Sequence, residues 1–266
     1  MSVTSFIPKV WSARLQENLH KQLVFGALCN RNYEGDISRY GDTVHINTLT
    51  DVTIRPYTRG AELAAPEALS GTDQTLTIDH SVYCHFCLND LDAAQARADV
   101  LEAAMRGAAR RLAEDTESYL LGVIEDGAGI TGTLDPTGDI FAQIVGIKTA
   151  MDLRSVPRTG RALVIPPTLE GALIQDSRFV TAGGAIAGSA LADGVVARAA
   201  GFDIYISNDL TDEVVALTED GVTFAQQIAE MEAYRPEKAF ADAVKALSLC
   251  GAKVVVPDCV AVYSIS

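Results

Sequence analysis

A long amphipathic stretch at residues 90–121 constrains the fold of this chain more than any other feature. Its apolar residues recur at spacings of three and four, which places them on one face of a helix: Leu91, Ala94, Ala98, Leu101, Met105, Ala108 and Leu112. Asn89 is a favourable N-cap, and acidic residues follow in the first turn, where the helix dipole favours them. Such a helix would be on the order of 45 Å long. That length predicts a flat, elongated molecule rather than a small sphere.

The part of the chain before this helix has the pattern of β-strands. Val44 and Ile46 alternate with polar residues, and the same period of two covers residues 75–88. We therefore predict a strand over 43–54 that pairs antiparallel with one long amphipathic strand over 75–88.

The connection between these strands, RPYTRGAELAAPEALSGTD, contains two prolines and two glycines. Connections of this length without secondary structure are uncommon in compact domains and are usually functional. Tyr57, Leu63 and Leu69 cannot all be buried within such a hairpin, so the loop needs a partner surface. Arg55 and Arg59 can be solvated, or they can pair with acidic residues of a neighbour, because exposed ion pairs are individually weak.

Residues 1–40 form an N-terminal arm with scattered apolar side chains, and a helix is expected around 11–28. The chain's one tryptophan, Trp11, lies in this arm. A position near a chain end would normally leave it exposed in a monomer. Burial under another element or a neighbouring subunit would resolve that conflict.

The remainder of the chain alternates helices with short strands, so the predicted fold class is α+β. The expected elements are helices over 139–154 and 167–177 and strands over 161–166, 203–207 and 213–217. The spacing of apolar residues in 222–234 does not decide between a helix and a strand. In the C-terminal tail Pro257 interrupts a strand pattern, which predicts an edge or a bend. Residues 183–194 are rich in small side chains and are expected to form a flexible surface loop.

Charge and cysteine content limit the classes of function. The formal net charge is −14, from 35 acidic and 21 basic residues. Such a surface repels nucleic acid, so a protein that reads DNA or RNA sequence is not expected. The charge fits plain solubility or, alternatively, a container wall that does not adhere to packaged DNA.

Five cysteines without a secretory signal indicate a reducing compartment and mostly buried free thiols. No apolar run approaches the roughly 18 residues of a membrane span.

No group of residues predicts catalysis, a cofactor or a metal ion. GAGITG at 127–132 has the glycine spacing of a dinucleotide-binding loop, but a predicted helix precedes it where that motif needs a strand. On the predicted strand, His80 and Cys84 lie on one face and His85 and Cys87 on the other, so the four cannot converge on one ion. The sequence also has no Gly-Lys-Ser/Thr phosphate loop and no Gly-x-Ser-x-Gly elbow. We therefore expect no cofactor and no enzyme activity.

Several blocks of sequence resemble a known family. DTVHINTLTDVTIRPYTRG followed by LTIDHSVYCHFCLND resembles the strand, extension loop and strand of tailed-bacteriophage major capsid proteins. GVVARAAGFDIYISNDL and MEAYRPEKAFADAVKALSLCGAKVVVPDCVAV resemble the later part of that family, so the resemblance runs from about residue 5 to residue 262. It implies the Hong Kong 97-type capsid fold and a major capsid protein that self-assembles into the icosahedral shell around double-stranded DNA.

The resemblance also implies a division of the chain. The parts, in chain order, are an N-terminal arm at 1–40, a peripheral domain at 41–134 with an extension loop (50–76) and a spine helix (90–121), a mainly axial domain at 135–250, and a C-terminal strand at 251–266 that returns to the peripheral domain. Subunits would form pentamers and hexamers through axial-domain contacts, with each extension loop over a neighbour. The expected contact residues are Trp11, Arg55, Tyr57, Arg59 and Glu62.

The resemblance implies partners as well as contacts. Because the arm begins almost at Met1, a separate scaffolding protein is expected, together with a portal. The loop at 51–75 contains no lysine, so crosslinking through a loop lysine is not expected. The shell would be assembled in the host cytoplasm and become part of the virion, with no role for a membrane.

Other functions remain open at this point. An encapsulin-like bacterial nanocompartment shares the fold and size, and the motif IRPYTRG favours a phage over it. An acidic enzyme that binds a nucleotide at 127–132 is disfavoured by the order of elements around that loop. A tail or head-joining protein is disfavoured by the length of the resemblance.

Overall fold

The computed structural model of the protein describes residues 23–33, 40–49, 53–56, 59–60, 65–66, 71–89, 99–175, 197–237 and 241–266. Its helices are α2 (Phe25–Leu28), α4 (Asp99–Gly127), α5 (Ile140–Leu153) and α6 (Pro167–Gln175), with 3-10 turns η3 (Glu219–Gly221) and η4 (Pro257–Cys259). Its strands are β1 (Thr43–Leu49), β2 (Gly71–Thr77), β3 (His80–Asn89), β4 (Ile130–Leu134), β5 (Arg161–Ile165), β6 (Ala197–Ala199), β7 (Phe202–Ile206), β8 (Glu213–Thr218), β9 (Val222–Tyr234), β10 (Ala241–Val254) and β11 (Val260–Ile265). The predicted α+β class is confirmed.

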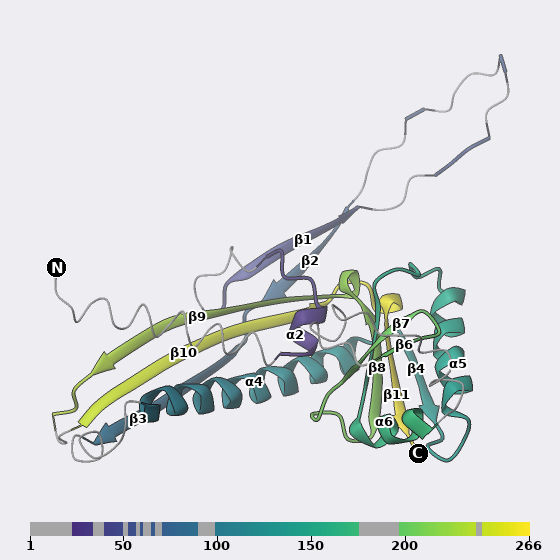
Figure 1. Cartoon of the computed structure of the whole chain (residues 1–266). Coiled ribbons are helices and arrows are strands. Elements are labelled where there is room, and N and C mark those ends of the chain that lie inside the picture. Colours follow the sequence, from purple (N-terminus) through teal and green to yellow (C-terminus); the bar gives the residue numbers. More distant parts are fainter. Residues whose placement is uncertain are drawn as a thin grey trace.

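The described strands form three sheets. β1 and β2 form an antiparallel hairpin, and β3, β10 and β9 form an antiparallel sheet in that order. The third sheet is mixed, with the order β4-β11-β8-β5-β7-β6. Figure 1 shows α4 running along β9 and β10 in an elongated body, with the six-stranded sheet and its helices at one end. We call these parts the body (β3, β9, β10 and α4) and the six-stranded end (β4 to β8, β11, α5 and α6).

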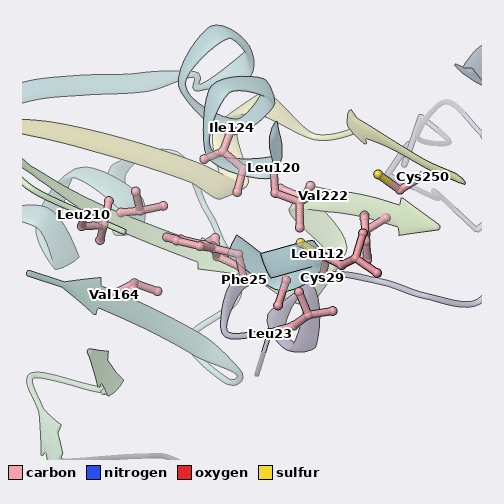
Figure 2. Close-up of a cluster of buried hydrophobic side chains, with 14 of the residues drawn as sticks. Leu23, Phe25, Cys29, Leu112, Leu120, Ile124, Val164, Leu210, Val222 and Cys250 are labelled. Atoms are coloured by element: carbon pink, nitrogen blue, oxygen red, sulfur yellow. The ribbon is translucent and has the colours of Figure 1, made fainter. Parts of the chain in front are cut away.

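Helix α4 joins the two parts through one apolar cluster. Its side chains Leu112, Leu120 and Ile124 pack around Phe25 of α2 (Figure 2). The same cluster contains buried residues of both sheets: Val164, Val215, Leu217, Val260 and Val262 from the six-stranded end, and Val222, Phe224, Ala246 and Cys250 from the body. Because the stripe of α4 is buried against both sheets, most of the helix's stability comes from this packing.

The other face of the six-stranded sheet is covered by α5 and α6. Ile144, Ile147 and Met151 of α5 and Leu169 and Leu173 of α6 pack on the sheet. Their partners from the strands are Leu163, Ile165, Phe202, Ile204, Val214, Ala216 and Ala261. The sheet of the six-stranded end is therefore covered on both faces, by α5 and α6 on one side and by α4 and α2 on the other.

The predicted long helix is present as α4, but it ends at a different residue. Residues 90–98 lie outside the described part of the chain, so the start at residue 90 and the cap at Asn89 are not tested. The end at residue 121 is wrong, because α4 continues to Gly127. Thr116 and Glu117 are polar residues on its buried face, and they interrupt the apolar pattern. The pattern therefore did not predict the last turns of the helix.

The predicted single strand over 75–88 is two strands. β2 ends at Thr77 in the hairpin, and β3 begins at His80 in the sheet of the body. At the change of sheet the N–H of Ile78 donates to the carbonyl of Asp42. Leu76, Ile78 and Val82 stay on one side throughout, so the period of two could not reveal the break.

Other element predictions are largely confirmed. The helix over 139–154 is α5, the helix over 167–177 includes α6, and the open segment 222–234 is strand β9. Pro257 lies in the bend η4 between β10 and β11, as its sequence context predicts. The strand expected over 43–54 is shorter, because β1 ends at Leu49 and Thr53–Pro56 has no regular structure. No helix of the described ranges has the length and apolarity to span a membrane.

Strand pairing does not follow the contiguous domain ranges that the resemblance implies. β9 and most of β10 fall in the range 135–250 but pair with each other and, through β10, with β3 of the body. The last strand, β11, pairs with β4 and β8 in the six-stranded end. A local sequence pattern carries no signal of such long-range partners, and the division of the chain into domains stays a prediction.

Candidate assembly surfaces

The hairpin β1–β2 is attached to the body only at its base, as far as the described residues show. Its register runs from Thr43 opposite Thr77 to Leu49 opposite Gly71. At the base, a small apolar cluster joins the hairpin to β9, β10 and the turn after β10: Val44, Ile46, Leu76, Ile78, Ala225, Leu249 and Val255. From there the two strands project away from the rest of the molecule (Figure 1).

Side chains beyond the hairpin face solvent in the single chain. Ile54 is 95% exposed, and Arg55 and Arg59 are exposed as well. The structure therefore leaves these two predicted contact residues accessible to a neighbour. The other predicted contact residues, Trp11, Tyr57 and Glu62, lie outside the described residues, as do residues 183–194.

A second surface feature is the attachment of the segment Leu23–Arg31 to the body. Glu117 of α4 is 1% exposed, and its carboxylate accepts the N–H of Phe25 at 2.9 Å and of Gly26 at 3.1 Å. The N–H of Asn30 donates to the carbonyl of Val222, and the carbonyl of Asn30 accepts from Phe224. These bonds hold this segment of the predicted arm (1–40) on α4 and β9.

Glu117 lies in an acidic setting. Burial raises its pKa to about 7, Asp209 acts in the same direction, and the two N–H donors oppose the shift. A pocket of about 280 Å³ lies beside it, lined by Arg110 and Glu114 of α4 and by the loop that follows β7. Burial also raises the pKa of Asp209, and the charge of Glu114 adds to the effect. Sequence analysis missed Glu117, although an acid four residues after Ala113 and three before Leu120 falls in the buried register of the helix.

The outer face of the three-stranded sheet, opposite α4, carries polar and aromatic groups. His85 lies within hydrogen-bonding distance of the Tyr234 hydroxyl, and Lys245 lies over the Tyr234 ring and pairs with Glu232. Next to them, Tyr83 is 76% exposed. On this face, therefore, His85, Lys245 and Glu232 contact side chains of other strands in the same sheet.

The residues that could suggest chemistry have structural partners. His80 contacts Asp115 at 2.6 Å and stacks on Tyr119 of α4, whereas His85 points to the opposite face, as predicted. All five cysteines are free, with Cys87 exposed. Among the described residues no group of three His, Cys, Asp or Glu side chains could hold a metal ion.

The glycine-rich segment at 127–132 is a packing site. α4 precedes it and β4 follows, which is the reverse of the order a dinucleotide-binding loop requires. A Cβ at Gly129 would lie 2.5 Å from the carbonyl oxygen of Pro257, and one at Gly127 would overlap Val254. Gly129 therefore permits the close approach of the turn η4, and Gly127 that of the end of β10.

The hairpin, the long helix α4 and the mixed sheets match solved phage capsid structures, so the chain has the Hong Kong 97-type capsid fold. Residues 88–263, more than half of the chain, match the family described as phage capsid protein, and the chain belongs to that family. It is a major capsid protein of tailed phages, a structural component of the icosahedral shell of the virion and not an enzyme.

Solved structures share this fold. A structure of Mycobacterium phage Che8 is 27% identical, with a TM-score of 0.70 over 91% of this chain and 90% of that chain. The capsid structure of the cyanophage P-SCSP1u is 17% identical, with a TM-score of 0.70 over 92% and 88% of the two chains. A virus-like particle from Pyrococcus furiosus is 12% identical, with a TM-score of 0.64 over 96% and 98%. None of the curated proteins matches the sequence.

Proposed function

We propose that the body is the peripheral domain of the capsid subunit and that the six-stranded end is its axial domain. The spine helix is then α4, and the extension loop consists of β1, β2 and the residues between them. The proposal is supported by the 29 residues of α4, which correspond to about 44 Å, and by the long strands that run beside it. An elongated domain of this kind can reach several neighbours in a shell.

The observation that carries the assembly mechanism is the hairpin, because a two-stranded hairpin is marginally stable in water. Its base is fixed to the body, yet Ile54 beyond it has almost no cover in its own chain. The hairpin of each subunit would lie over its neighbour, where Ile54 is buried and Arg55 and Arg59 meet acidic residues. Trp11, Tyr57 and Glu62 complete the proposed set of contact residues.

The same proposal extends to the partners of the shell. Subunits form pentamers and hexamers, because repeated modest contacts close a symmetric shell. A separate scaffolding protein and a portal take part in assembly, and the finished shell encloses double-stranded DNA. The net charge of −14 is consistent with a wall that does not bind DNA tightly or by sequence.

A nanocompartment shell is the second candidate, because the virus-like particle from Pyrococcus furiosus shares the fold. The contents of particles purified from the native host separate the two functions. Double-stranded DNA of a defined length supports the phage head. A single enclosed protein species without DNA supports the nanocompartment and contradicts DNA packaging.

The role of the hairpin is tested with the double variant Ile54→Asp/Arg55→Glu, expressed with the neighbouring genes. The subunit should fold as the wild type does, since both side chains are exposed, while the yield of shells in electron micrographs should fall about tenfold or more. The control Ile54→Val/Arg55→Lys keeps the apolar and positive character and should assemble. Wild-type yields of shells from the double variant would contradict a contact through the hairpin.

A further inference from the structure

The chain passes from the hairpin to the sheet of the body directly over one glycine of β10. Strand β3 pairs with β10 only as far as His80 opposite Cys250, so the next residue of β10, Gly251, has no partner in β3. The residues that lead from β2 to β3 cross the sheet at this point. A Cβ at Gly251 would lie 2.4 Å from the carbonyl oxygen of Thr77 and 3.1 Å from the Cα of Ile78.

This contact is made by main-chain atoms, so the rotation of a side chain cannot relieve it. The carbonyl of Ile78 accepts the N–H of Gly41, and the N–H of Ile78 donates to the carbonyl of Asp42. These bonds hold the crossing chain in the base of the hairpin. Since ordinary contacts of a Cβ begin at 3.4 Å, a methyl group on Gly251 would displace the carbonyl of Thr77 by about 1 Å.

The sheet offers a flat surface under the crossing chain. On β9 the residue opposite Gly251 is Ala225, which is fully buried in the apolar cluster at the base of the hairpin. Glycine inside a strand has no side chain to pack and weakens the strand, and it often marks the close approach of another backbone. The approach of Thr77 and Ile78 therefore explains the glycine at this position of β10.

The contact lies where a small shift has a large effect on the position of the hairpin. Each described strand of the hairpin has seven residues, which correspond to about 23 Å. Both strands leave the body from the base, so a change of direction there grows toward the outer end. Figure 1 shows that the hairpin leaves the body obliquely to β9 and β10. Its direction is therefore not set by pairing with either of these strands.

We infer that Gly251 is a positioning residue for assembly, because it lets the crossing chain lie directly on β10 and so sets the direction in which the hairpin projects. That direction determines where the residues beyond the hairpin meet the next copy of the chain. The inference rests on the proposed function of the hairpin and adds the residue that orients it.

The test measures the direction of the hairpin in the free subunit. Spin labels are attached to ketone-bearing side chains that replace Asp73 of the hairpin and either Ser118 of α4 or Leu153 of α5, all of which are exposed. The wild type should give narrow distance distributions. Gly251→Ala should shift at least one mean distance by about 2 Å or more, because the displacement grows along the hairpin. The control Gly122→Ala, where a Cβ meets nothing within 4 Å, should leave both distances unchanged.

The same variant is then expressed with the neighbouring genes. Gly251→Ala should yield about tenfold fewer closed shells in electron micrographs, because a displaced hairpin loses its contacts with the neighbour. A residue that only supports the fold would lower the melting temperature without moving the labels. Unchanged distances in Gly251→Ala would therefore overturn the inference, and so would shifted distances combined with normal shells.

The wild-type distances test the inference even when Gly251→Ala does not fold. A broad distribution between the labelled hairpin and both helices would show that the contact at Gly251 does not fix the direction, which overturns the inference. Each of these results leaves the capsid function intact. Failure of the wild type to form any ring or shell with its neighbouring genes would instead contradict the proposed function.

Discussion

The body and the six-stranded end place their buried polar groups differently. The layer between α5, α6 and the sheet is mainly apolar, and the buried charge of the six-stranded end, Arg161 at the start of β5, is paired with Asp152 of α5. Between α4 and the strands of the body, by contrast, Gln226 donates to the hydroxyls of Thr116 and Ser248, and Glu117 is buried beside them along the helix. Apolar layers tolerate small shifts, whereas buried hydrogen bonds are lost when their geometry changes. The core of the body therefore depends more on orientation, and its buried carboxyl group, Glu117, makes its stability depend on pH.

The largest effect is expected from removing a buried ring in either part. Phe202→Ala in the six-stranded end and Phe224→Ala in the body should each destabilise the subunit by about 3–5 kcal/mol, through lost burial and the cavity left behind. Thermal unfolding followed by circular dichroism measures both variants. Since one cluster spans α4 and both sheets, each variant should shift a single transition. Two separate transitions would show that the parts unfold independently, which would break the comparison above.

A smaller, pH-dependent effect is expected at Glu117. Its folded pKa of about 7 lies above the ordinary value of 4.5, so the unfolded chain releases its proton first as pH rises. Stability from this group is therefore lost between about pH 4.5 and 7, by roughly 2–3 kcal/mol, and the loss is complete above pH 7. Glu117→Gln should remove this part of the slope in urea unfolding measured from pH 4.5 to 8.

Glu125 at the end of α4 provides the control for that experiment. Its pKa is also raised to about 7, by burial and by a hydrogen bond with Glu213. Glu125→Gln should therefore keep the part of the slope of unfolding free energy against pH that comes from Glu117. The slopes of the two variants should differ, and the difference separates the contributions of the two carboxyl groups. An unchanged slope in Glu117→Gln would mean that the carboxylate is hydrated in solution, and the contrast between the two parts would lose its pH dependence.

Sequence analysis predicted those features of the fold that depend on local periodicity. The stripe of α4, the helix α5 and strands such as β7 follow from the spacing of apolar residues. Three features did not follow from it. Thr116 and Glu117 disguised the end of α4, the unbroken alternation through Ile78 hid the change of sheet, and the partners of β11 are distant in sequence.

Sequence analysis named only some of the residues of the candidate surfaces. Arg55 and Arg59 were predicted as contact residues from the length of a loop that has no core of its own, and the structure leaves both exposed, so their contacts stay a prediction. Glu117 and Gly251 were missed. A buried acid and a glycine beneath a crossing chain can be recognised only when the packing partner of each is known. For Glu117 that partner is Phe25, about 90 residues away in the sequence.

The smallest effect is expected on the outer face of the body. Lys245→Met removes an exposed ion pair with Glu232 and a contact with the ring of Tyr234, so the free subunit should lose less than about 1 kcal/mol. Urea unfolding at low and high salt measures this, and the difference from wild type should shrink further at high salt. A loss above about 2 kcal/mol, or one insensitive to salt, would place this pair among the buried polar contacts of the body. The polar contacts of the body would then extend from its core to its surface.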